Sequence, residues 1–237
     1  MAAVMGILVA HEMGHFLMAV RYHVPASFPH FIPLPIAPFG TMGAVIGMRG
    51  FQADRRQMFD LGLAGPLAGL AVAVPVLWVG AGQLRLVPLV DPGPVFHHPL
   101  LLQLMLKLLR PDLPADALVQ LPIGQFNPLL MAGWVGLLVT GLNMLPLGQL
   151  DGGHVTYALL GRRAHLLART LLIGVIFFIL IAEEYMWVLM VVLVTLLGTD
   201  HPPTADDRVP LGWPRRLLGW ASLWIPVLCF SPLGISM

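Results

Sequence analysis

Charged residues are scarce in this sequence. Lys, Arg, Asp and Glu make up 11% of the 237 residues, whereas 57% are hydrophobic. An average soluble domain has about 25% charged residues. The mean hydropathy of +0.83 points the same way. This composition excludes an ordinary soluble domain and indicates a membrane protein.

Cysteine is scarcer still, and the basic and acidic residues are nearly equal in number. Cys229 is the single cysteine, so no disulfide can form within the chain. We expect its thiol to pack as a small hydrophobic group. The net charge of +1 gives no reason to expect a nucleic-acid partner.

Long apolar runs recur along the chain. A helix rises 1.5 Å per residue, so about 20 apolar residues cross the hydrocarbon core of a bilayer. We therefore predict an all-α polytopic membrane protein that forms a single domain over residues 1–237. About six transmembrane helices are expected, at about 1–22, 61–82, 127–147, 164–182, 185–197 and 217–232.

The segment after the first predicted span differs from the rest. Closely spaced prolines between residues 23 and 39 prevent a regular helix. Residues 39–49 are β-prone and punctuated by glycine, which predicts a small β edge strand or hairpin. An open edge formed by Gly40, Thr41, Met42 and Gly43 would bind an extended peptide by strand addition. A plain connecting loop is the alternative.

One motif stands out within the first apolar run. His11-Glu12-Met13-Gly14-His15 reads H-E-x-x-H. Residues four apart share one face of a helix, so His11 and His15 can bind one Zn²⁺, and Glu12 can take a proton from an attacking water. Ionisable groups cost about 3 kcal/mol each inside a membrane, so three together indicate function. The alternative is a helix that carries these residues by accident.

A catalytic zinc ion needs a third protein ligand. Asp151 follows the third predicted span and precedes two glycines, which allow a close backbone approach. A dication beside it would stabilise its carboxylate and offset the cost of burial. Two alternatives stay open: Asp151 caps the helix that starts at Gly152, or His154 is the third ligand.

Asn143 lies in the same interrupted segment, eight residues before Asp151. Its amide can donate a hydrogen bond to a developing oxyanion or to a substrate carbonyl. The alternative is a structural hydrogen bond that satisfies a buried polar group. His97 and His98 form another histidine pair, for which a surface position is favoured over a second metal site.

The distribution of basic residues predicts the orientation in the membrane. If the carboxyl end of the first span faces the cytoplasm, nine basic residues lie on that side and three on the other. This topology places His15 and Asp151 near the cytoplasmic face. The nine are Arg21, Arg49, Arg55, Arg56, Arg162, Arg163, Arg208, Arg215 and Arg216, and the three are Arg85, Lys107 and Arg110.

These motifs together resemble the site-2 protease family of intramembrane zinc metalloproteases. The H-E-x-x-H motif matches that of the family, and Asn143 with Leu150-Asp151-Gly152-Gly153 matches its N…LDGG segment. Ala64-Gly65-Pro66-Leu67-Ala68-Gly69 resembles a family stretch of small residues, and Gly40-Thr41-Met42-Gly43 resembles its G-x-x-G strand. The loop of residues 201–207 is similar to a segment of some bacterial and plastid members. No inserted PDZ-like domain is evident.

The resemblance implies both an activity and a set of roles. His11, His15 and Asp151 would bind one Zn²⁺ per chain, with Glu12 as the base and Asn143 assisting. The first three spans would form a three-helix catalytic core. The substrate would be a single-pass membrane protein cut within the lipid bilayer, in regulated intramembrane proteolysis. A membrane zinc carrier or sensor without hydrolysis is the alternative function, and a catalytically inactive scaffold is a third.

Overall fold

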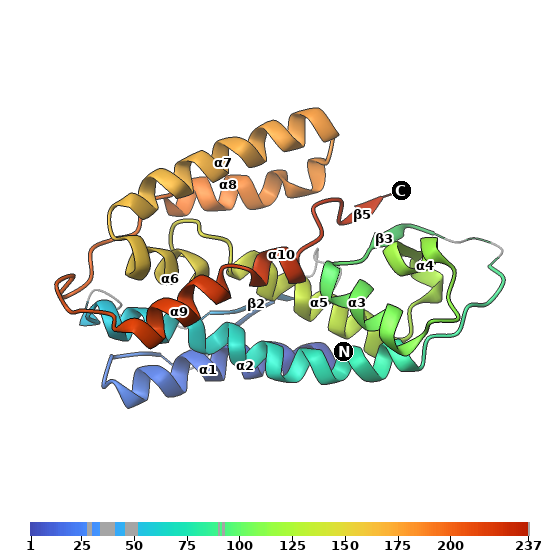
Figure 1. Cartoon of the computed structure of the whole chain (residues 1–237), viewed down its shortest axis with the longest axis horizontal. Coiled ribbons are helices and arrows are strands. Elements are labelled where there is room, and N and C mark those ends of the chain that lie inside the picture. Colours follow the sequence, from blue (N-terminus) through green and yellow to red (C-terminus); the bar gives the residue numbers. More distant parts are fainter. Residues whose placement is uncertain (28–29, 34–40, 46–51, 90, 92, 237) are drawn as a thin grey trace.

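Helices dominate the structure, and the longest of them run roughly along one axis of the molecule (Figure 1). The computed structural model describes the chain except residues 28–29, 34–40, 46–51, 90, 92 and 237. The predicted helical class is confirmed, because the described residues are mostly helical, with two small sheets.

Two long helices form the base of the fold. Helix α1 (Ala2–Arg21) packs along α2 (Arg55–Gly82), and Gly14 lies where they touch. A Cβ at position 14 would overlap the Ala64 carbonyl of α2, so only glycine permits this close approach. The α2 helix starts earlier than the predicted residue 61 because Asp54 caps it and its side chain accepts hydrogen bonds from the backbone of residues 56 and 57.

Helix α5 (Pro128–Asn143) completes a three-helix group with α1 and α2. Asn127 caps it, and Pro128 occupies its first turn, where a missing N–H costs nothing. At 16 residues, α5 is shorter than the predicted span 127–147, because the chain leaves the helix after Asn143.

The chain then turns sharply into α6 (Asp151–Leu160), which packs against α2. Gly148 adopts a positive φ of 47°, and backbone carbonyls crowd the next two glycines. A Cβ on Gly152 would overlap the Met144 carbonyl, and one on Gly153 would overlap that of Gly148. The paired glycines therefore allow the start of α6 to fold back against the end of α5.

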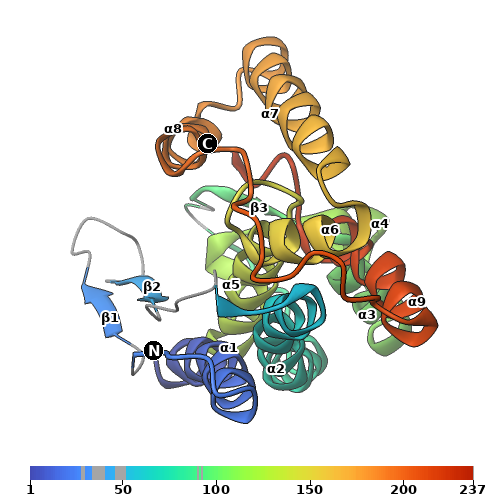
Figure 2. The ribbon, with the colours of Figure 1, turned by 90° about the vertical axis from the view of Figure 1, so that its left-hand side faces the viewer.

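Helices α7 (Arg163–Ala182) and α8 (Val188–Leu197) stand together beside this group, joined by a short 3-10 turn, η3 (Tyr185–Trp187) (Figure 2). Many of their large apolar side chains are exposed, as in helices that face lipid. Among the described residues, α1, α2 and α7 are long and apolar enough to cross a membrane, whereas α5, α8 and α3 are shorter. Six full-length spans are therefore not confirmed.

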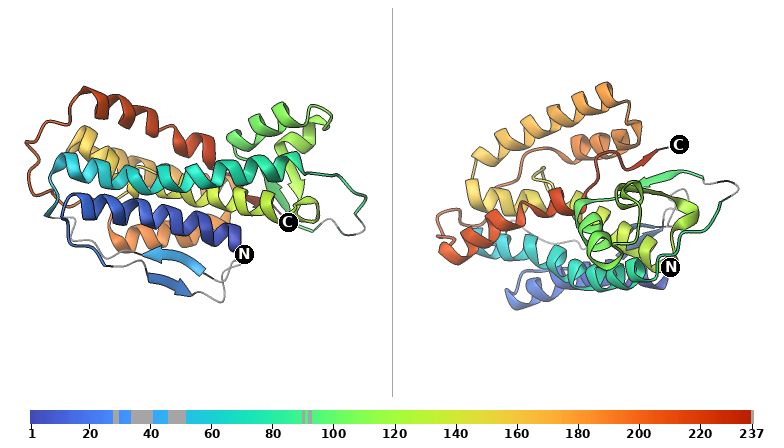
Figure 3. Two further views of the ribbon diagram at one scale, coloured as in Figure 1. Left: turned by 90° about the horizontal axis from the view of Figure 1, so that it is seen from below. Right: turned by 45° about the vertical axis from the view of Figure 1, so that its right-hand side comes forward.

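The last predicted span, 217–232, is broken in the structure. It consists of α9 (Trp213–Ser222) and α10 (Ile225–Cys229), separated near Leu223, with Pro226 in the first turn of α10. Helix α9 packs on α6, and α10 packs on α5 (Figure 3). The prediction of one continuous helix was wrong because hydropathy alone does not locate such a break.

Strands occur in two places. The predicted strand is present as β2 (Thr41–Val45), beside α1 (Figure 3). It pairs antiparallel with β1 (His30–Pro33), a strand within the proline-rich segment that the sequence did not predict. A three-stranded sheet that the sequence did not reveal has the order β4-β3-β5. Its strands are β3 (Val95–His97), β4 (Gln120–Pro122) and β5 (Ile235–Ser236), and α3 (Leu100–Leu109), α4 (Ala115–Val119) and η2 (Ile123–Gln125) accompany them.

This sheet changes the interpretation of the His97-His98 pair. The His98 side chain is only 2% exposed, and its Nδ1 donates to the Leu118 carbonyl. Burial lowers the pKa of His98 to about 4, so the ring is neutral near pH 7. The favoured surface position was wrong for His98, because α4 and the Phe126 ring pack against it.

Candidate metal centre

The two histidines of the H-E-x-x-H motif lie one turn apart on the buried face of α1. His11 is 3% exposed and His15 is 5% exposed. Their Nε2 atoms are 3.2 Å apart, with the ring planes inclined by 66°. The i, i+4 spacing thus brings two potential ligand atoms to one point, as the sequence predicts.

Asp151 completes the cluster from the first residue of α6. Its two carboxylate oxygens lie 3.1 Å from His11 Nε2 and 3.3 Å from His15 Nε2. Tetrahedral Zn²⁺ with bonds of about 2.1 Å separates neighbouring ligand atoms by about 3.4 Å. Two imidazoles and one carboxylate, gathered at nearly this spacing and largely buried, form a donor set that fits a catalytic zinc ion.

The backbone of α2 orients the His15 ring. His15 Nδ1 lies 2.9 Å from the Leu61 carbonyl oxygen, which can only accept, so Nδ1 carries the proton. The lone pair is then on Nε2, the atom that faces His11 and Asp151. A hydrogen bond of this kind to the second nitrogen is typical of histidines that bind metals.

Glu12 lies between the two histidines in sequence and is half-buried on α1. It is close enough to His11, His15 and Asp151 for their charges to interact. A carboxylate at the edge of a buried metal cluster is a suitable group to receive a proton there.

Asn143 approaches the same cluster from the last residue of α5. Its side-chain nitrogen lies 3.4 Å from His11 Nε2, and the side chain is half-buried. Helix α1 and, more than 100 residues later, the consecutive helices α5 and α6 therefore supply polar groups to one site.

The structure also bears on the two alternatives for Asp151. Leu150, not Asp151, is the N-cap of α6, and no side chain caps this helix. His154 lies outside the metal cluster among the described residues, and its Nδ1 is 2.6 Å from His201 Nε2 instead. Neither alternative role is seen.

The predicted substrate strand is only partly described. Thr41, Met42 and Gly43 lie in β2, next to α1, whereas Gly40 falls outside the described residues.

Two features of the site were not found from the sequence. The first is Gly65 of α2, where a Cβ would overlap the His15 ring. The stretch of small residues from Ala64 to Gly69 indicated close helix packing, but it did not indicate contact with a metal-binding histidine. The second is the contact of His154 with His201, for which the sequence offered only a loop of unassigned role.

A helical, apolar chain with a largely buried His–His–Asp cluster defines a membrane-type protein with a candidate metal centre. Comparison with known families agrees with this class. The model of peptidase family M50 matches residues 1–182, so the chain belongs to that family. The resemblance to site-2 proteases is therefore confirmed.

Curated relatives support the same family. The protein named "Probable zinc metalloprotease EGY1, chloroplastic" of Arabidopsis thaliana is 32% identical over 246 residues, which cover 97% of this chain and 42% of that protein. The rice (Oryza sativa subsp. japonica) protein of the same name is 35% identical over 242 residues, covering 97% and 40%. The chain thus spans about two fifths of the length of these relatives. No solved structure matches the chain.

Proposed function

We propose that this chain is a zinc-dependent endopeptidase that cleaves membrane-spanning segments of single-pass membrane proteins, in regulated intramembrane proteolysis. The observation that carries the proposal is the meeting of His11, His15 and Asp151 beside Glu12 in the buried interior. Membership of family M50 and the names of the relatives add support.

The metal-binding residues would be His11, His15 and Asp151, with one Zn²⁺ per chain. When bound, zinc lowers the pKa of water and polarises a carbonyl group. Glu12 would take the proton from the attacking water and deliver it to the leaving amine nitrogen. The Asn143 amide would donate a hydrogen bond to the carbonyl oxygen as negative charge develops on it.

The substrate would have to unwind before it is cut, because a membrane-spanning helix keeps its carbonyl groups in its own hydrogen bonds. The β1–β2 hairpin beside α1 is the candidate edge for holding it extended, with Thr41, Met42 and Gly43 of β2 in contact with the substrate. Strand addition satisfies backbone groups that would otherwise be unpaired in a water-poor site.

We further propose that the chain crosses the membrane several times, with the shorter apolar helices α5 and α8 adding to α1, α2 and α7. The positive-inside rule places the end of α1 at the cytoplasm. The metal cluster would then lie near the cytoplasmic face, and a polar path from that side would supply water.

Replacement of Glu12 by Gln tests the activity. The purified variant should retain about one zinc per chain but lose cleavage of a reconstituted single-pass substrate by at least about 100-fold. Full cleavage by Glu12→Gln would exclude Glu12 as the base. Zinc binding without cleavage by the wild-type protein, with zinc flux across the vesicle membrane, would support a carrier instead.

A further inference from the structure

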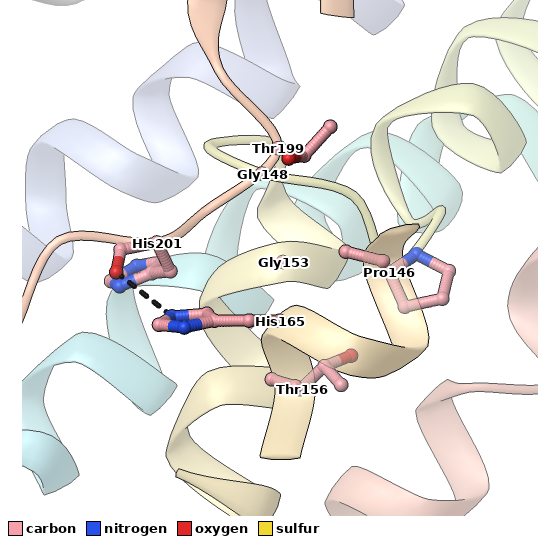
Figure 4. Close-up of a pocket in the computed structure, with 9 residues that line it drawn as sticks. Pro146, Gly148, Gly153, Thr156, His165, Thr199 and His201 are labelled. Carbon is pink, nitrogen blue, oxygen red and sulfur yellow. Dashed lines mark hydrogen bonds between the residues drawn. The ribbon is translucent and has the colours of Figure 1, made fainter. Parts of the chain in front are cut away.

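A second group of imidazoles lies near α6, outside the metal cluster. His154 comes from α6, His165 from α7, and His201 from the loop between α8 and α9. His201 is 4% exposed and forms part of the wall of a small cavity of about 10 Å³, with His165 beside it (Figure 4).

The hydrogen bonds fix which nitrogen of each ring carries the proton. His201 Nδ1 lies 2.5 Å from the Pro202 carbonyl oxygen, which can only accept, so Nδ1 is the donor. In the neutral ring His201 Nε2 is then an acceptor, and His154 Nδ1, at 2.6 Å, must donate to it. His154 is thereby held in the Nδ1–H form, with the lone pair on its Nε2.

Both rings are neutral near pH 7. Burial lowers the pKa of His154 to about 4, and the nearby His201 lowers it further in the same direction. Burial also lowers the pKa of His201.

The loop that carries His201 is firmly held. The Tyr157 ring stacks on the His201 ring at 4.5 Å between centroids. His165 Nε2 donates to the His201 carbonyl at 3.1 Å (Figure 4). The Tyr157 hydroxyl donates to Asp207 at 2.8 Å, and the Thr204 hydroxyl donates to the same carboxylate at 2.7 Å. These contacts tie the loop that carries His201 to α6 and α7.

His154 lies next to the metal cluster. It follows Asp151 by three residues, so both share one face of α6. Its Cβ packs against Gly62 of α2, where any side chain would collide with it, and the preceding Leu61 carbonyl is the one that holds His15. Asp151 and His15 are near enough for electrostatic interaction with the His154 ring.

We propose that His154 Nε2 accepts a hydrogen bond from a backbone N–H of the bound peptide substrate, and that His201 is the positioning residue that keeps His154 in the required form. This inference rests on the proposed function. A substrate opened into an extended chain exposes N–H groups that need acceptors where water is scarce. The carbonyls of the surrounding helices are already used within those helices. Among the described residues, the side-chain hydrogen bond seen for His154 is made by Nδ1, which leaves Nε2 available as an acceptor.

The positioning role is tested without any activity measurement. Nitrogen-15 NMR of histidine-labelled, metal-free protein reports the protonated nitrogen of His154. We expect Nδ1–H in the wild type, a mixture of both forms in His201→Phe, and recovery of Nδ1–H in His201→Gln, which restores an acceptor. His165→Phe is the matched control, because it loses a hydrogen bond to the same loop but leaves His201 Nε2 in place. An unchanged His154 signal in His201→Phe would overturn this part.

The substrate contact is tested by binding, in a Glu12→Gln background that does not turn over. A peptide with the sequence of a cleaved membrane segment is compared with versions in which single backbone amides are replaced by esters. One ester should weaken binding about three- to tenfold, and the penalty should vanish when His154→Phe is added. An equal penalty with and without His154, or no binding of any peptide, would overturn the proposal. Failure of the proposed function would give a different result: the wild-type protein would bind the peptide but would not cleave it.

Discussion

Gly65 of α2 lies directly against the imidazole of His15, so a Cβ at position 65 would overlap the ring at its Nε2. The α2 helix thus positions His15 in two ways. Gly65 leaves room for the imidazole ring, and the Leu61 carbonyl accepts a hydrogen bond from His15 Nδ1. Zinc affinity should therefore depend on a residue that offers no ligand atom.

The first prediction concerns this space. Gly65→Ala should weaken zinc binding at least about tenfold, because the methyl group displaces the His15 ring. Metal analysis after dialysis against a zinc buffer measures the effect. Gly6→Ala in α1 is the control, since its Cβ would meet nothing within 4 Å. Equal zinc content in both variants would show that the ring can move aside.

The second prediction concerns the third ligand. Asp151→Ala should lower zinc occupancy well below one per chain, because two imidazoles alone bind the ion more weakly. Asp116→Asn, an exposed carboxylate on α4, should keep wild-type occupancy. Wild-type zinc content in Asp151→Ala would remove Asp151 from the ligand set.

A third prediction links the metal to stability. A chelator should lower the melting temperature of the detergent-solubilised wild-type protein, because zinc bound only to the folded state stabilises it by mass action. Added zinc should restore the value. The chelator should leave the melting temperature of Asp151→Ala almost unchanged, and a similar drop in both proteins would indicate an effect unrelated to this site.

A fourth prediction concerns an ion pair that joins three helical segments away from the metal. Arg215 of α9 donates two hydrogen bonds to Asp60 of α2, at 2.9 and 2.8 Å, and the Tyr22 hydroxyl at the end of α1 donates to the same carboxylate. Asp60→Asn should lower stability by about 1–2 kcal/mol, since hydrogen bonds to a charged group are lost at a partly buried site. Zinc content should not change.

Thermal unfolding in detergent gives the measurement for this network. Arg169→Gln is the matched control, because its ion pair with Asp200 is largely exposed, and exposed pairs contribute little. If both variants melt at the wild-type temperature, the contacts of Asp60 add nothing to stability.

The sequence predicted well where local spacing decides the outcome. The i, i+4 spacing put His11 and His15 together, and the β-prone, glycine-punctuated residues 39–49 predicted a strand, which is present as β2. It predicted the spans less well, because α5 ends at Asn143 and the segment after residue 213 is broken near Leu223. Hydropathy measures how apolar a run is, but packing determines where its helix ends.

By itself, the sequence determined the membrane character of the chain and the pair of histidines with Glu12 between them, because both depend on composition and on the repeat of a helix. Only the tertiary structure decided that Asp151, 140 residues beyond His11, meets it at 3.1 Å, and that His154 Nδ1 lies 2.6 Å from His201 Nε2. Contacts between segments so distant arise from how α1, α2 and α6 pack, and no local pattern of residues encodes that packing.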